Sequence, residues 1–219
     1  MGEDDSGPSA LRTVASVFGV LAGIGGITHG IGEVLQGNVA PDGLFFDSWV
    51  EGPIATGMGG DPAISLVPNL LVTGILTLVV SVVVIVWAVA FVGRPRGGLV
   101  LVLLSVVLLL VGGGVGSPVV GFLAGLAGIG SGRSLAGFQA RLPGRVRAVL
   151  GRLWPWAFAV ATLSGLFLFV GAVVLVYSVE MNDPDLFLNA FYFTVVSLIV
   201  AVLAGAAHDS ERQGRIGAV

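Results

Sequence analysis

Six apolar stretches alternate with short polar connections along this chain, and their lengths predict membrane-spanning helices. An apolar helix needs roughly 20 residues to cross the hydrocarbon core of a bilayer. Four of the stretches have that length, and two shorter ones flank the glycine-rich string GGGVGSP. The predicted spans are 11–35, 63–92, 99–111, 118–129, 154–179 and 186–207. The pattern therefore predicts an all-α, polytopic transmembrane helix bundle that forms one integral membrane domain over residues 1–219.

The apolar stretch between residues 97 and 132 has two interpretations. As one span, it would place the arginines that follow it on the opposite side of the membrane from those that precede it. As a tight hairpin broken at GGGVGSP, it returns the chain to the side from which it came. The distribution of arginine favours the hairpin. Its second arm, 118–129, is short enough either to span the bilayer or to be a re-entrant segment shielded by protein.

Arginine is confined to one side of this predicted topology. The chain has ten basic residues other than histidine, all of them arginine. The connections 37–62 and 180–185 contain acidic residues and no arginine. Cytoplasmic connections of membrane proteins are enriched in basic residues, so we expect a cell-membrane protein with both termini in the cytoplasm. The arginines are Arg12, Arg94, Arg96, Arg133, Arg141, Arg145, Arg147, Arg152, Arg212 and Arg215.

Composition narrows the class of protein further. A hydrophobic fraction of 55% with only 11% charged residues excludes an ordinary soluble domain. The absence of cysteine excludes disulfides and thiolate metal sites. The dispersed arginines form no basic module for nucleic acid, and no zinc-protease or phosphate-loop motif occurs. We therefore expect the lipid bilayer as the surroundings of the chain, with no metal site, no evident cofactor and no catalytic residues.

Glycine recurs at helical spacing on two of the predicted helices. One stripe consists of Gly19, Gly23, Gly26 and Gly30, and a shorter one of Gly121, Gly125 and Gly128. Stripes of small residues let helix backbones approach each other closely in a membrane. They favour either packing within the bundle or a seam with a second copy or a membrane partner protein.

Glu33 is the only acidic residue inside any predicted span, and His29 is the only histidine there. His29 and Glu33 are one helical turn apart in the first span, and Gln36 follows them. An ionisable residue within a membrane is costly unless it is paired, and it often marks a functional site. The candidate ligand- or proton-binding residues at the same predicted depth are His29, Glu33, Gln36, Asn69, Thr73, Asn189 and Tyr192. The alternative is that the His29–Glu33 pair ends its helix in water near the lipid headgroups.

The strings HGIGEVLQGN and VPNLLVTG resemble those of small uncharacterised multi-pass membrane proteins of archaea and bacteria. The resemblance implies membrane location and no particular activity. The residues alone favour two functions, ahead of a membrane enzyme, for which a second catalytic group is not found. The first is binding or transport of a small solute or ion through an outward-facing polar pocket around His29 and Glu33. The second is a structural or regulatory membrane subunit that acts through helix packing with a partner protein.

Overall fold

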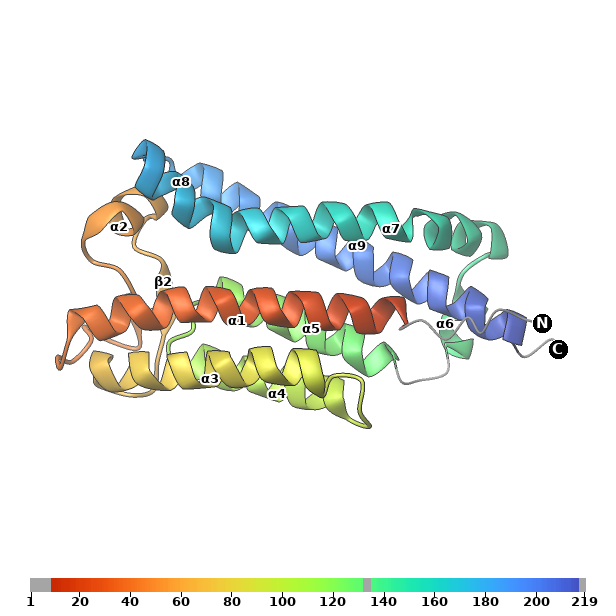
Figure 1. The fold of residues 1–219 in the computed structure, drawn as a ribbon, viewed down its shortest axis with the longest axis horizontal. Helices are drawn as coiled ribbons and strands as arrows, with labels where there is room; N and C mark the ends of the chain where they lie inside the picture. The colour runs from red at the N-terminus through yellow and green to blue at the C-terminus, as the bar shows by residue number, and fades with distance from the viewer. Residues whose placement is uncertain (1–8, 132–134, 217–219) are drawn as a thin grey trace.

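A computed structural model describes residues 9–131 and 135–216 and shows a bundle of helices (Figure 1). Its helical elements are α1 (Ala10–Gln36), α2 (Gly52–Met58), α3 (Leu70–Ala90), α4 (Gly97–Leu110), α5 (Gly116–Ser131), α6 (Ala136–Arg141), α7 (Gly144–Leu166), the π-helical segment η1 (Phe167–Gly171), α8 (Ala172–Val179) and α9 (Pro184–Ile216). Two short strands, β1 (Phe45–Asp47) and β2 (Pro62–Ile64), pair in an antiparallel manner. The predicted all-α bundle is confirmed.

Four helices of the described chain are long and apolar enough to cross a membrane. They are α1, α3, α9 and the continuous helix formed by α7, η1 and α8. The two arms of the glycine-broken hairpin, α4 and α5, are shorter, at 14 and 16 residues. The chain therefore has the helices of a membrane-embedded protein, with a short hairpin packed among its longer helices.

The helices form two groups (Figure 1). In the first group, α1 packs against α3 and α5, and α4 packs against α5. In the second group, α7 and α9 pack against each other as an antiparallel pair along one side of the first group. Asp209, near the end of α9, accepts hydrogen bonds from the backbone N–H groups of Ala10 and Leu11 at 2.8 and 3.0 Å. The start of α1 and the end of α9 therefore lie at the same end of the bundle.

The two ends of the bundle differ in charge. One end, which we call the arginine end, carries the start of α1, the α3–α4 connection, the start of α7 and the end of α9 (Figure 1). The opposite end, which we call the acidic end, carries residues 37–69 and the α8–α9 connection. Arg133 lies outside the described residues. The separation of charge agrees with the pattern in the sequence.

Helix α3, which corresponds to the second predicted span, begins later than predicted. The sequence predicted a span over 63–92, but residues 62–64 form β2 and α3 begins only at Leu70. Asn69 is the cap, because its side chain accepts a hydrogen bond from the N–H of Val72 at 3.1 Å. Pro68 disfavours helical backbone at the residue before it, which explains why the apolar run is not helical from its start.

Two other helices extend beyond their predicted ends. The helix predicted over 154–179 begins at Gly144, and the one predicted over 186–207 continues to Ile216. The turns before residue 154 are therefore continuous with the apolar helix. Hydropathy delimits the apolar part of a helix and not its ends, because polar turns outside the membrane keep their internal hydrogen bonds.

Both glycine stripes face helices of the same chain. A Cβ atom added at Gly30 would lie 3.0 Å from the backbone oxygen of Gly74 on α3, and one added at Gly128 would lie 2.9 Å from the Cα atom of Gly98 on α4. A side chain at these positions would push the helices apart. The stripes thus hold the first group of helices together.

Candidate functional site

The connection between α1 and α3 folds back over the last turns of α1 at the acidic end. The pairing of β1 with β2 closes this connection, with α2 between the strands. The indole N–H of Trp49 donates to the backbone oxygen of Thr28 at 3.2 Å. The side-chain amide of Gln36 donates to the backbone oxygen of Ser48 at 2.8 Å. These contacts fix Ser48 against α1, and the backbone N–H of Ser48 in turn donates to the backbone oxygen of Asp61 at 3.2 Å.

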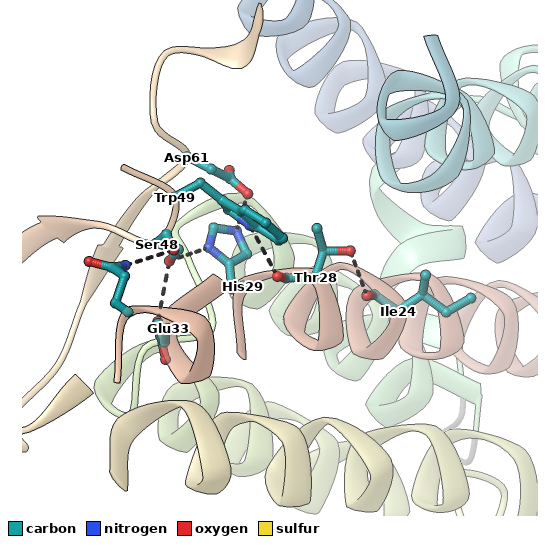
Figure 2. A network of polar contacts seen from close by, with 8 residues as sticks. Ile24, Thr28, His29, Glu33, Ser48, Trp49 and Asp61 are labelled. Carbon is teal, nitrogen blue, oxygen red and sulfur yellow. Dashed lines mark hydrogen bonds and ion pairs between the residues drawn. The ribbon is translucent and has the colours of Figure 1, made fainter. Parts of the chain in front are cut away.

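Asp61 reaches α1 through an unusual turn. Gly59, Gly60 and Asp61 all have positive φ angles, of 74, 86 and 57°. Glycine takes this left-handed conformation without strain, and aspartate tolerates it better than most residues. The turn directs the Asp61 carboxylate toward the ring of His29, as Figure 2 shows.

Four side chains form a continuous hydrogen-bonded row, which we call the polar network (Figure 2). Asp61 Oδ2 lies 3.2 Å from His29 Nε2. His29 Nδ1 lies 2.9 Å from Ser48 Oγ, and the Ser48 hydroxyl donates to Glu33 Oε1 at 3.2 Å. Both His29 and Glu33 belong to the same face of α1, one turn apart, as the sequence predicted. The partners that join them come from the α1–α3 connection.

The inner end of the polar network is sealed within the bundle. Glu33 has no exposed surface, and its second carboxylate oxygen lies 3.4 Å from the Thr77 hydroxyl on α3. Thr77 in turn lies 2.6 Å from the backbone oxygen of Val111, at the end of α4. Glu33 is therefore enclosed by protein, and the alternative that the pair ends its helix in water is wrong.

The glycine-rich string between α4 and α5 covers the polar network from a third side. Gly112 and Gly114 have positive φ angles of 109 and 74°. A Cβ atom at Gly112 would lie 2.5 Å from Glu33 Oε1, and one at Gly114 would overlap the ring of His29. The string thus lets bare backbone approach a buried carboxylate and an imidazole, in addition to turning the hairpin.

A cavity of about 360 Å³ adjoins the outer end of the polar network. It lies between α1 and α5 on one side and η1, α8 and α9 on the other, with Met58 of α2 at its edge. His29 and Asp61 form its polar wall. Four aromatic side chains form much of the rest, namely Phe169, Phe187, Phe191 and Tyr192. The cavity is therefore apolar with one charged wall, and a π-helical turn, which often occurs at functional sites, lines it.

The other predicted site residues are distributed differently. Gln36 binds the backbone of the α1–α3 connection, and Asn69 caps α3 and donates to Asn38 Oδ1 at 2.6 Å. Thr73 is buried and pairs with the Ser65 hydroxyl at 3.1 Å. Of the two predicted site residues on α9, Tyr192 lines the cavity, whereas Asn189 is exposed and does not. Of the predicted candidates, His29 and Tyr192 thus line one cavity, whereas Asn69 and Asn189 do not line it.

The order Asp61–His29–Ser48 is that of a hydrolase triad, but the geometry does not provide a nucleophile. Ser48 has no exposed surface and is not among the described residues that line the cavity. Its hydroxyl is also hydrogen-bonded to Glu33, so a substrate has no path to the oxygen. Among the described residues, no group of three His, Cys, Asp or Glu side chains is placed to hold a metal ion. The polar network is suited to holding and shifting a proton.

The protonation of Asp61 is expected to affect stability. Burial raises the pKa of its carboxyl above the ordinary value of 3.8, the charge of His29 lowers it, and Asp47 raises it again. Because the folded state binds this proton more tightly than the unfolded state does, the proton's stabilising contribution is absent above the folded-state pKa. It grows as the pH falls through that pKa and is complete below 3.8.

We therefore expect the melting temperature of the wild type, relative to that of Asp61→Asn, to rise as the pH is lowered from about 8 to about 4. Thermal unfolding in detergent across this range measures the difference. Asp42→Asn, at an exposed position of the same connection, is the control and should give no such trend. If the difference in melting temperature between the wild type and Asp61→Asn does not change with pH, the Asp61 carboxyl has the same pKa in the folded and the unfolded state.

The fold and the site define a class of protein, a helical membrane-type bundle with a buried Asp–His–Ser–Glu network beside an aromatic cavity. No family model, curated protein or solved structure matches this chain.

Proposed function

We propose that this chain is a multi-pass protein of the cell membrane that binds a small solute in the cavity at its acidic end, as a step in moving that solute across the membrane. Both termini would lie in the cytoplasm, because the start of α1 and the end of α9 are at the arginine end of the bundle and cytoplasmic segments of membrane proteins are enriched in basic residues. The cavity would then face outward. Four helices with the length and hydropathy of membrane spans support the location.

The observation that carries the proposal is the cavity that ends on His29 and Asp61. Small-molecule sites are concave and mostly apolar, with a few polar groups that fix the orientation of the ligand. This cavity has that composition, and its polar wall belongs to a buried network that tight packing alone would not require. A solute that is largely apolar with one polar group fits it better than an inorganic ion does.

The alternative, a subunit that acts through helix packing with a partner, has less support. Its main feature in the sequence was the pair of glycine stripes, and both stripes face helices of the same chain. The exposed apolar side chains of α3, α7 and α9 are those expected of lipid-facing helices. A partner surface is therefore not needed to explain them.

Access to the cavity from outside can be measured with single cysteines, because the chain has none of its own. Thr28 lines the cavity and is half-buried, and its hydroxyl bonds to the backbone oxygen of Ile24. Ser105 has the same kind of bond, to Leu101, but is buried between α4 and α5. We expect Thr28→Cys to react at least about tenfold faster than Ser105→Cys with membrane-impermeant methanethiosulfonates of either charge, added outside intact cells.

Two results of this labelling would count against the proposal. Equal, slow reaction of both cysteines would show that the cavity is closed to water, which favours the packing subunit. Faster reaction of Thr28→Cys only in inverted vesicles would show that the acidic end faces the cytoplasm, which overturns the proposed orientation.

A further inference from the structure

We propose that the cavity binds an organic monocation, with its positive charge against Asp61 and its apolar part between the aromatic side chains, and that this cation competes with a proton for the polar network. The inference rests on the proposed function, because it requires that the cavity take a solute. It adds the chemical class of that solute and a coupling to pH.

The hydrogen bonds of the polar network determine its net charge. The distances allow one arrangement in which every donor has an acceptor and His29 is protonated. Its Nε2–H donates to Asp61, its Nδ1–H donates to Ser48, and the Ser48 hydroxyl donates to Glu33. Two carboxylates and one imidazolium carry a net charge of about −1 in this arrangement. The site therefore lacks one positive charge.

A second arrangement has the same composition and the same net charge. The Nδ1–H bond of His29 breaks as an O–H bond forms on Ser48, while the former Ser48 O–H bond breaks and an O–H bond forms on Glu33. Glu33 then donates to Ser48, Ser48 donates to His29 Nδ1, and His29 still donates to Asp61. No proton leaves the protein. The shift moves a positive charge away from the cavity wall and leaves a neutral imidazole there.

The described residues around the polar network add no positive charge to it. The titratable groups that face the polar network from neighbouring elements are Asp47 on β1 and Tyr192 on α9. No described arginine lines the cavity, and the arginine-bearing segments lie at the opposite end of the bundle. An arriving cation therefore meets a carboxylate that only His29 counterbalances. Once the proton has shifted to Glu33, the Asp61 charge is free to pair with the cation.

The cavity has an aromatic lining that suits the apolar part of an organic cation. Phe169 on η1 and Phe187, Phe191 and Tyr192 on α9 line it opposite the polar wall. The faces of aromatic rings attract organic cations, most strongly where water is excluded. A volume of about 360 Å³ leaves room for an aromatic or alkyl group attached to a quaternary or tertiary ammonium. An anion would find no cationic partner among the described residues of the wall other than His29.

Competition with a proton follows from the charge count. When the polar network takes up a second proton, its net charge becomes zero and its attraction for a cation is lost. The cation and that proton are then alternatives at one site, so each unit of pH below the titration of the network should raise the dissociation constant about tenfold. A membrane protein with this property would exchange an external cation for a proton.

The test uses benzyltrimethylammonium and its uncharged isostere neopentylbenzene, whose quaternary carbon replaces the nitrogen. Binding to the full chain in detergent is measured by titration calorimetry at several pH values. We expect the cation to bind at least about tenfold more tightly than the isostere near pH 8, and to lose about tenfold in affinity per pH unit on the acid side. Asp61→Asn should abolish the preference for the cation, and Asp42→Asn should keep it.

The outcomes separate this inference from the proposed function. Equal affinity for the two ligands would overturn cation recognition while leaving a solute-binding cavity in place. Cation binding that does not change with pH in the wild type would overturn the competition with a proton, and this result needs no variant that could fail to fold. Binding of neither ligand would overturn the inference, and the labelling of Thr28→Cys then decides the proposed function by itself.

Discussion

Replacing Gly114 with alanine is expected to lower the free energy of unfolding by roughly 3 kcal/mol and to eliminate ligand binding in the cavity. Gly114 has a φ angle of 74°, a region that costs a residue with a Cβ atom about 1 to 2 kcal/mol. The added methyl group would also overlap the ring of His29, which is held on both nitrogens. His29 can relieve the overlap only by giving up its hydrogen bonds to Ser48 and Asp61.

The neighbouring glycine provides a matched control for this substitution. Gly116 begins α5, and a Cβ atom there would lie 3.5 Å from the nearest atom of Phe191, which is an ordinary contact. Gly116→Ala should therefore melt within a few degrees of the wild type. Thermal unfolding of the two variants in the same detergent compares them directly. A melting temperature of Gly114→Ala equal to that of Gly116→Ala would show that the glycine-rich string does not lie against His29.

The helical part of the site could be predicted from the sequence because it depends on local periodicity. His29 and Glu33 are one turn apart, and in any helix that places them on one face. The cost of an unpaired carboxylate in a membrane then implied that Glu33 has partners inside the protein, which the structure provides through Ser48 and Thr77. The separation of arginine from acidic residues was equally readable, because it is a property of whole connections and not of exact helix ends.

The partners in the α1–α3 connection could not be predicted in the same way. Ser48 and Asp61 reach α1 only because two strands of three residues pair with each other, and strands of that length leave no period-2 pattern to recognise. The sequence did contain one signal. Two glycines followed by Asp61 indicate a turn with successive left-handed residues, and not the start of a helix.

The aromatic cavity depends on tertiary structure that periodicity does not report. Its walls come from two groups of helices that meet only in the folded bundle, and one wall contains the π-helical turn of η1. Nothing in the string FLFVG distinguishes a π-helical turn from ordinary α-helix. Tyr192 was assigned to the site from its depth alone, and three phenylalanines near it were not, because polar residues are the usual candidates for a site and aromatic walls are mistaken for core.

The final prediction concerns Glu33, for which two substitutions should have opposite consequences. In Glu33→Gln, the amide oxygen can accept from Ser48, and the amide N–H can donate to Thr77, whose own hydroxyl is bonded to the Val111 oxygen at 2.6 Å. Every partner stays satisfied and a buried charge is removed, so the free energy of unfolding should stay within about 1 kcal/mol of the wild type or increase. His29 can then no longer pass its Nδ1 proton through Ser48 to residue 33, so while His29 stays protonated the network has no net charge, and benzyltrimethylammonium should lose its advantage over neopentylbenzene.

Glu33→Ala removes the same charge but leaves a cavity in a place where the wild-type side chain has no exposed surface. We expect it to cost about 2 to 4 kcal/mol, as large-to-small changes at packed sites do. Thermal unfolding and ligand titration of the two variants separate the two roles of the residue, since Gln keeps the volume and loses the charge whereas Ala loses both. If Glu33→Ala were as stable as the wild type, Glu33 would have to reach water, and the sealed inner end of the polar network, on which the coupling to a proton depends, would not exist.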